Sequence, residues 1–254
     1  YQLPALTNLG TSFGMGLIVC TTMVGLPLAD APKAALVGLL GAVVGSIVSV
    51  RLMIIFTKAY YGDLEMVDVT EGDIIPDGKR KVRKGSYGSR FIQSLLEGGK
   101  VGVDMGMSII PGVLLICSLV IMLTNGPGAD GLYDGSANQG VALLPLLGDK
   151  LSFIIKPLFG FTSAEAIAVP ITALGSSGAA IAIVGEMVKS GKALGNDIAV
   201  FTSICMCWSG YLSTHIAMMD ALDTKEMTGK AILSHTIGGI CGGVAAHFIY
   251  LLLG

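Results

Sequence analysis

The sequence predicts an all-α, polytopic integral membrane protein with about five spanning helices plus broken or re-entrant helical segments. Hydrophobic residues make up 52% of the 254 positions and charged residues 13%, whereas soluble domains carry about 25% charged residues. Glycine occurs 36 times, about twice its usual frequency, which suits helices that pack closely or break inside a bilayer. A lipid bilayer is therefore the first expected partner.

Composition also excludes several function classes. A net charge of -2 does not indicate a nucleic-acid partner. The five cysteines lie in apolar segments and are expected to be small buried residues. No HExxH motif occurs, and three separated histidines define no metal site, so we expect no metal and no organic cofactor. Since the chain begins at Tyr1 without methionine, we also expect an N-terminal portion to be absent.

Residues 1–59 are expected to form an N-terminal transmembrane helix pair. Residues 11–28 are a continuous apolar run about long enough to cross a bilayer, and residues 34–59 form the next span. The second span has a face of small residues suited to close helix contact: Gly38, Gly41 and Gly45.

Residues 60–94 form a polar loop. Seven of the sixteen Lys and Arg residues fall between positions 58 and 94. Because basic loops stay on the cytoplasmic side, the loop is predicted to be cytoplasmic.

Residues 95–254 are expected to form a second transmembrane region. Residues 91–124 begin as an amphipathic helix and become a span, in which Pro111 predicts a kink. Residues 141–161 are interrupted by prolines and charges, which favours a re-entrant or interfacial segment.

Residues 164–190 predict a broken helix, interrupted by the sequence Gly-Ser-Ser-Gly at 175–178. A backbone break at membrane depth exposes unpaired N–H and C=O groups, and transporters use such breaks as binding points. A tight turn between two short buried helices is the structural alternative.

Residues 197–219 predict one helix with two polar faces, in which Asp197 is suited to cap the N-terminus and Gly210 offers a place to distort. One face carries hydroxyl and carboxyl groups at helical spacing: Thr202, Ser209, Ser213 and Asp220. The other face carries rings that suit a planar polar ligand: Trp208, Tyr211 and His215.

The last predicted span, residues 231–253, carries His235 and two overlapping GxxxG pairs. The glycines predict close packing against the preceding helix, which would bring His235 to the same central zone. His247 lies nearer the far end and is the weaker candidate.

Four segments together carry a family resemblance: EGGKVGVDMGMSIIPGVLLI, PLFGFTSAEAIAVPITALGSSGAA, NDIAVFTSICMCWSGYLSTHIAMMD and AILSHTIGGICGG. They resemble the bacterial membrane proteins with a nucleoside-recognition or Gate domain, which is distantly similar to part of the concentrative nucleoside transporters. The resemblance covers roughly residue 97 to the C-terminus. It implies a multi-pass protein of the bacterial cytoplasmic (inner) membrane.

The residues and the resemblance together lead to the hypothesis of a noncatalytic transporter or permease for a small polar solute, with a nucleoside or nucleobase as candidate. Coupling to Na⁺ or H⁺ is expected through Glu165, Glu186 or Asp197. The substrate-binding candidates come from the broken helix, the two-faced helix and the last span: Glu165, Ser176, Ser177, Asp197, Thr202, Trp208, Ser209, Tyr211, Ser213, His215 and His235.

Two alternatives stay open. The chain is a noncatalytic scaffold or partner subunit if its polar residues serve helix assembly, and either a homo-oligomer or a second membrane subunit fits that role. It is a rhomboid-like intramembrane serine protease if Ser177 acts as nucleophile and His235 as base, although no upstream His-x-x-x-Asn segment supplies an oxyanion hole.

Overall fold

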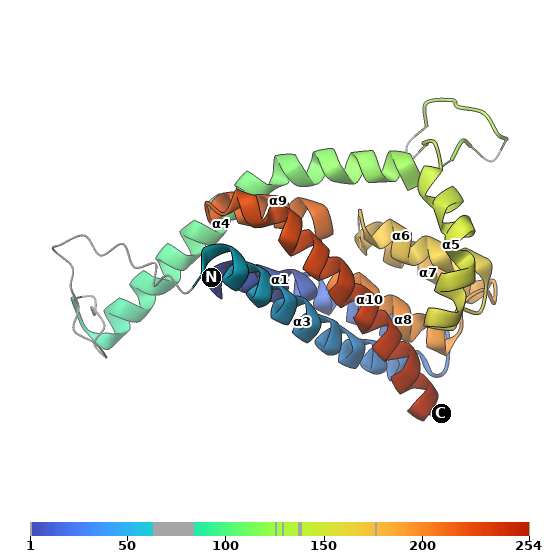
Figure 1. The fold of residues 1–254 in the computed structure, drawn as a ribbon, viewed down its shortest axis with the longest axis horizontal. Helices are drawn as coiled ribbons and strands as arrows, with labels where there is room; N and C mark the ends of the chain where they lie inside the picture. The colour runs from blue at the N-terminus through green and yellow to red at the C-terminus, as the bar shows by residue number, and fades with distance from the viewer. Residues whose placement is uncertain are drawn as a thin grey trace.

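The computed structural model of the protein describes residues 2–62, 84–124, 126–128, 130–136, 139–175 and 177–253, and these residues form helices and no strand (Figure 1). The prediction of an all-α protein is confirmed for them. The helices in chain order are α1 (Gln2–Phe13), α2 (Gly16–Val24), α3 (Ala31–Tyr61), α4 (Tyr87–Thr124), α5 (Leu143–Phe159), η1 (Ala164–Ile167), α6 (Ala168–Ala173), α7 (Ser177–Lys189), α8 (Gly195–Cys207), α9 (Tyr211–Ala221), η2 (Lys225–Met227) and α10 (Thr228–Leu253).

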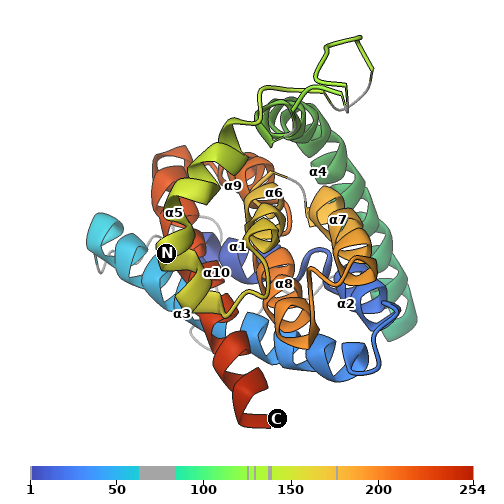
Figure 2. The ribbon, with the colours of Figure 1, turned by 90° about the vertical axis from the view of Figure 1, so that its right-hand side faces the viewer.

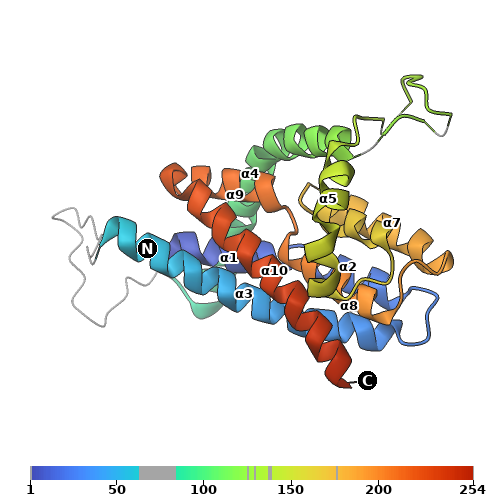
Figure 3. The ribbon, with the colours of Figure 1, turned by 45° about the vertical axis from the view of Figure 1, so that its right-hand side comes forward.

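Two helical segments in the described part of the chain are long and apolar enough to cross a membrane, Ala31–Tyr61 and Lys225–Leu253. They contain the predicted spans 34–59 and 231–253. Helices α3 and α10 run side by side (Figure 3). The small-residue face predicted on α3 is confirmed as a packing face, because a Cβ on Gly41 would lie 2.6 Å from the carbonyl oxygen of Gly242.

The two GxxxG pairs of α10 contact different partners. The pair Gly238 and Gly242 faces α3, whereas a Cβ on Gly239 would lie 2.0 Å from Nε1 of Trp208, which follows α8. A Cβ on Gly243 would lie 2.8 Å from Phe159 of α5. The expectation of packing against the preceding helix alone was therefore too narrow, because adjacent residues point to different sides of a helix.

Helix α3 has its polar and small residues inside and its large apolar residues outside. Most inward residues are small or polar, among them Gly38, Gly41, Gly45, Ser46, Ser49 and Thr57, and Val37 and Met53 are the larger apolar residues on that side. The outward residues recur at helical spacing: Leu36, Leu40, Val43, Val44, Ile47 and Ile55. This is the reverse of the pattern on a surface helix of a soluble protein.

The N-terminal apolar run is not one helix. The structure begins α1 at Gln2 and interrupts it at Gly14 and Met15, before α2 begins at Gly16. The apolar run at 11–28 therefore does not form a single helix, because a side chain from a distant segment enters the helical hydrogen-bond ladder at this point, as described below.

Helix α4 is continuous from Tyr87 to Thr124, contains Pro111 and changes direction along its length (Figure 1). A proline removes one ladder hydrogen bond and crowds the preceding turn, so the expected kink is confirmed. Residues 141–161 contain one helix, α5, rather than short broken pieces. The cytoplasmic loop predicted at 60–94 falls largely on residues 63–83, which lie outside the described residues.

The predicted interruption within 164–190 is confirmed, since α6 ends at Ala173 and α7 begins at Ser177. By contrast, the single helix predicted for 197–219 is two helices. Helix α8 ends at Cys207, and α9 begins at Tyr211 after Gly210, whose φ of +70° lies in the left-handed region. Glycine permits this conformation without steric cost, which explains where the chain breaks.

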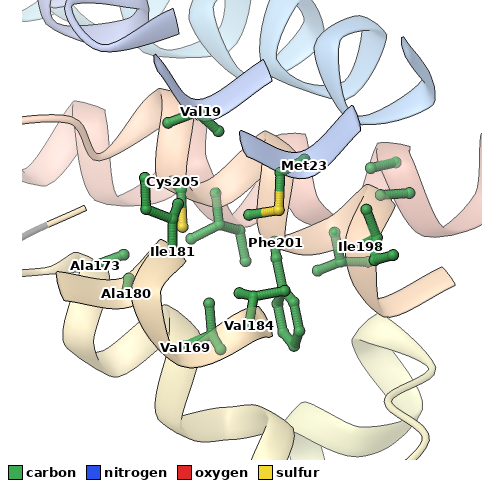
Figure 4. Packing of buried hydrophobic residues seen from close by; sticks show 14 of the residues in the cluster. Val19, Met23, Val169, Ala173, Ala180, Ile181, Val184, Ile198, Phe201 and Cys205 are labelled. Carbon is green, nitrogen blue, oxygen red and sulfur yellow. The ribbon is translucent and has the colours of Figure 1, made fainter. Parts of the chain in front are cut away.

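Helix α8 lies at the centre of the bundle (Figure 2). From Asp197 to Cys207 every one of its residues is buried. Around it pack α1, α2, α3, α6, α7 and α10. Phe201 and Ile198 of α8 meet Met23 of α2 and Val184 of α7 in the main apolar cluster (Figure 4). Helices from the beginning and the end of the chain thus share one core.

Candidate functional site

Two helix breaks meet at Ser209. In an unbroken helix the N–H of Met15 would donate to the carbonyl of Thr11, four residues earlier. Here the Ser209 hydroxyl stands between them: it accepts the Met15 N–H at 3.0 Å and donates to the Thr11 carbonyl at 3.0 Å. Ser209 itself belongs to the break between α8 and α9. One side chain therefore joins both interruptions.

The two breaks also approach closely in their backbones. A Cβ on Gly14 would lie 3.0 Å from Oγ of Ser209. Gly210 has positive φ and lies so near Thr214 that a Cβ would come within 2.0 Å of its Oγ1. A larger residue at Gly14 would press on Ser209, so glycine at that position lets the two breaks meet. Gly210 is instead required by its own positive φ and by Thr214 of the helix that follows it.

His235 of α10 caps the carbonyl that the second break releases. The N–H of Tyr211 donates to the Trp208 carbonyl at 3.2 Å, three residues back, which leaves the Cys207 carbonyl without its helical partner. Nε2 of His235 is hydrogen-bonded to that carbonyl. Buried backbone groups are nearly always paired, and here side chains from other helices supply the partners.

His215 and His235 lie beside each other at the centre of the molecule. Their ring centroids are 4.6 Å apart, and the two residues are 0% and 1% exposed. Nδ1 of His215 lies 2.7 Å from the carbonyl oxygen of Tyr211, and its Nε2 lies 3.0 Å from Oδ1 of Asn8. Nδ1 of His235 lies 3.2 Å from Oγ of Ser49.

Asn8 connects the histidines to two further helices. Its amide nitrogen donates to Oγ of Ser49 on α3 at 2.8 Å and to Oγ of Ser234 on α10 at 2.6 Å. We call the set Asn8, Ser49, His215, Ser234 and His235 the histidine network. It links α1, α3, α9 and α10 through buried polar side chains.

Three members of this network were not predicted as site residues: Asn8, Ser49 and Ser234. Asn8 lies before the first predicted span, and Ser49 lies in a span where small residues indicated packing only. The one signal that could have found them is their polarity within or beside apolar runs, since polar groups at membrane depth are costly.

Trp208 and Tyr211 stand next to the network, as predicted. Their ring centroids are 5.8 Å apart, and the Tyr211 ring lies 6.1 Å from that of His235. Nε1 of Trp208 donates to the His235 carbonyl at 3.3 Å, and the Tyr211 hydroxyl is hydrogen-bonded to Thr236. The structure thus brings together Trp208, Ser209, Tyr211, His215 and His235 from the predicted set.

Thr202 is not part of this cluster. Its hydroxyl donates to the Ile198 carbonyl of its own helix at 2.7 Å, and its Cβ would lie 2.4 Å from a Cβ on Gly38. Its role is close packing of α8 on α3. The side chain of Ser213 and the whole of Ser176 lie outside the described residues.

Asp197 lies at the far end of α8 and serves the helix terminus. It is the third residue of α8 rather than its cap, and its carboxylate accepts N–H bonds from Leu194 at 2.9 Å and Thr162 at 3.0 Å. The Thr162 hydroxyl also donates to it at 2.5 Å. Asp197 thus supplies one half of a capping box, accepting the N–H of the residue before α8, while Leu194 has no side-chain acceptor for the other half. The carboxylate is hydrogen-bonded at the helix terminus, away from the central rings.

Asn196 and His247 complete this terminal cluster. The Asn196 amide donates to the carbonyls of Phe159 and Gly160, both at 2.9 Å, and its oxygen lies 2.7 Å from Nδ1 of His247. The cluster fixes the start of α8 against α5 and α10. His247 is therefore remote from the histidine network.

The two glutamates expected to couple an ion are on the surface. Glu165 is exposed and pairs with Lys192 at 3.0 Å, and Glu186 is exposed and pairs with Lys189 at 2.8 Å. A hydrogen bond from its own backbone N–H, followed by the Lys192 ammonium, lowers the pKa of Glu165. Neither carboxylate lies beside the buried rings, so neither is supported as a coupling group.

The Ser177–His235 dyad of the protease alternative does not form. The buried Ser177 hydroxyl has no hydrogen-bond partner, and both ring nitrogens of His235 are occupied by Cys207 and Ser49. The described residues also contain no group of three or more His, Cys, Asp or Glu side chains arranged to hold a metal ion.

Comparison of the chain with models of known families, with curated proteins and with solved structures found no match. The resemblance to the Gate-domain proteins therefore stays a prediction.

Proposed function

We propose that the chain is a noncatalytic transporter or permease of the bacterial inner membrane that passes a small polar solute where the α1/α2 and α8/α9 breaks meet. The observation that carries the proposal is the insertion of the Ser209 hydroxyl between the Thr11 carbonyl and the Met15 N–H. This hydroxyl keeps the backbone hydrogen bond between Thr11 and Met15 from forming, inside the helix bundle.

Broken helices suit transport for a physical reason. Their free backbone donors and acceptors bind polar solutes in a place where no water competes, and the half-helices move as separate units. A solute that offers one donor and one acceptor would take the place of the Ser209 hydroxyl against Thr11 and Met15. The two halves of α1/α2 and of α8/α9 would then be free to move apart.

The neighbouring rings favour a planar solute. Trp208 and Tyr211 flank the break between α8 and α9, and aromatic faces stack on flat rings. Nucleosides and nucleobases are therefore the first class to test, as the Gate-domain resemblance also suggests.

The inside-out pattern of α3 supports the membrane setting, because its exposed side is apolar and its buried side carries glycines and serines. We propose a multi-pass arrangement of about five spans, with residues 60–94 on the cytoplasmic side.

Thermal stabilisation of the purified protein by solutes tests the proposal. Nucleosides, nucleobases, amino acids and metal ions are screened, and at least one nucleoside or nucleobase is expected to raise Tm. Ser209→Ala should weaken that shift. Ser190→Ala is the matched control, because Ser190 is exposed and donates within its own α7 terminus. Uptake of the same solute into proteoliposomes completes the test.

One observation favours the scaffold function as the second candidate. The side chains of the histidine network hydrogen-bond to one another and to backbone groups, which is what assembly of helices alone requires. If no solute shifts Tm while Ser209→Ala lowers the Tm of the free protein, the transporter proposal fails and the scaffold function stands.

A further inference from the structure

Each hydrogen bond of the histidine network can be assigned a donor and an acceptor. A neutral imidazole carries one N–H and one acceptor nitrogen, whereas an imidazolium carries two N–H groups. A backbone carbonyl accepts only, and a serine hydroxyl donates one hydrogen. These rules assign a donor and an acceptor to each contact in turn.

His235 is satisfied as a neutral ring. Its Nε2 faces the Cys207 carbonyl and must carry the hydrogen. Its Nδ1 then accepts the hydroxyl hydrogen of Ser49, 3.2 Å away. Oγ of Ser49 in turn accepts from the Asn8 amide nitrogen at 2.8 Å.

His215 is not satisfied as a neutral ring. The Asn8 amide nitrogen donates its two hydrogens to Ser49 and Ser234. The Asn8 amide oxygen therefore faces Nε2 of His215, 3.0 Å away. The other nitrogen, Nδ1, lies 2.7 Å from the carbonyl oxygen of Tyr211. Both neighbours are acceptors, and a neutral ring has a hydrogen for only one of them.

Rotating the Asn8 amide by 180° does not remove the difficulty. It would place the amide nitrogen against Nε2 of His215, which a neutral ring accepts. The amide oxygen would then face the hydroxyls of Ser49 and Ser234, and both would have to donate to it. Ser49 would lose its bond to His235, and Ser234 would lose its bond to the Ala231 carbonyl at 2.9 Å.

We propose that the histidine network binds one exchangeable proton on His215, and that this proton is the coupling ion of the transporter. The coupling role of this proton rests on the proposed transport function. The binding of a proton to His215 does not depend on that function. The bound state keeps every contact of the network hydrogen-bonded. The released state is reached by rotation of the Asn8 amide and two hydroxyls, and it breaks the link between Ser49 on α3 and His235 on α10.

The network holds no more than one such proton. A second positive charge on His235, with its ring centroid 4.6 Å away, would be repelled by the first. Neither ring has a carboxylate partner, so only oxygen dipoles hold the cation while burial opposes it. A proton held in this way can leave again, as a coupling ion must.

The surroundings of His215 contain few other titratable groups. Tyr211 of its own helix and His235 of α10 are in ring contact with it, and α1 contributes the amide of Asn8. The elements that pack against α9 are α1, α4, α10 and η2. With the exception of Arg90, which is half-buried at the start of α4, the charged side chains described on these elements and on α9 are exposed: Glu97, Lys100, Asp104, Asp220, Lys225, Glu226 and Lys230.

Magnetic resonance of isotope-labelled histidine rings tests the proposal in the full chain, since there are only three histidines. Burial opposes the charge on His215 and lowers its pKa. In a titration downward from about pH 8, one ring is therefore expected to pass from one N–H to two at a pH below the ordinary histidine range. That signal should vanish in His215→Gln and persist in His247→Gln. His247 is the matched control because it lies on α10, far from the histidine network. A His215 ring that keeps one N–H wherever the protein is folded overturns the proposal.

Asn8→Asp provides a second variant in case His215→Gln does not fold. A carboxylate in place of the amide stabilises the cation, so the midpoint of the titration should rise by about one pH unit or more. An unchanged midpoint in Asn8→Asp contradicts the assignment.

Uptake assays separate the two proposals. Solute uptake that proceeds without a His215 titration refutes the proton site and leaves the transporter. A His215 titration in a protein that moves no solute supports the proton site and refutes the transporter.

Discussion

Gly45 of α3 and Gly238 of α10 meet backbone to backbone. A Cβ on Gly45 would lie 2.5 Å from the Gly238 carbonyl oxygen, and a Cβ on Gly238 would lie 2.6 Å from that of Gly45. This approach sets the separation of the two long apolar helices, and it brings Ser49 one turn further along α3 within reach of His235. The histidine network therefore depends on two glycines outside it, one of which, Gly238, packs directly against Ser49.

Gly238→Ala should destabilise the protein by about 1–3 kcal/mol, because the added methyl group meets rigid backbone rather than a movable side chain. Thermal unfolding in detergent measures the effect. Gly229→Ala, near the start of the same helix, has nothing within 4 Å of the new Cβ. That control should leave stability unchanged or raise it by up to about 1 kcal/mol. Equal Tm values for the two variants would refute the close α3–α10 contact.

Gly210→Ala should lower the free energy of unfolding by more than backbone strain alone would. Gly210 and Gly191 both have a φ of +70°, but only Gly210 has an atom, Oγ1 of Thr214, within 2.0 Å of the added Cβ. Left-handed backbone costs a residue with a Cβ about 1–2 kcal/mol, and that is the expected loss for Gly191→Ala. A larger loss is expected for Gly210→Ala, with part of it recovered in Gly210→Ala combined with Thr214→Ala. Unfolding curves of the three variants decide the matter.

Two buried serines should respond oppositely to alanine. Ser203 is 0% exposed and its hydroxyl has no hydrogen-bond partner, so Ser203→Ala removes an unpaired polar group and should leave Tm unchanged or raise it. Ser49→Ala removes the partner of both Asn8 and His235 and should cost about 1–3 kcal/mol. A loss of stability in Ser203→Ala as large as that in Ser49→Ala would contradict the hydrogen-bond assignment.

Glu165→Gln should lower the stability of the protein slightly at neutral pH and should not change it in acid. It should not affect solute binding. The pKa of Glu165 is lowered by its backbone hydrogen bond and by Lys192, so its contribution is fully present above the unfolded pKa. That contribution disappears as pH falls through the folded pKa. Tm of wild type and variant should therefore differ slightly at neutral pH and converge in acid. A loss of the solute-induced shift in Glu165→Gln would restore this carboxylate to the site.

Sequence patterns predicted the helical class, the bounds of both long apolar helices to within a few residues, and an interruption at 175–178, where the structure has α6 end at Ala173 and α7 begin at Ser177. They also indicated five ring-bearing and hydroxyl residues of the central cluster, because rings and hydroxyls stand out in an apolar helix. Among the residues that the structure places outside the central cluster are Thr202 and the three predicted carboxylates. Glu165, Glu186 and Asp197 drew attention as carboxylates, yet two are in surface ion pairs and one belongs to a helix terminus.

The amino-acid sequence by itself determined that this chain is helical and apolar, and that its glycines are spread along its whole length. Hydropathy and helical spacing are local properties, so they can be read along the chain. Only the tertiary structure decided that Ser209 opens the ladder of α1/α2 and that Asn8 and Ser49 meet the two histidines. Those contacts join residues up to 226 positions apart, as between Asn8 and Ser234, and they exist because backbone groups released by helix breaks must find partners inside a dry core.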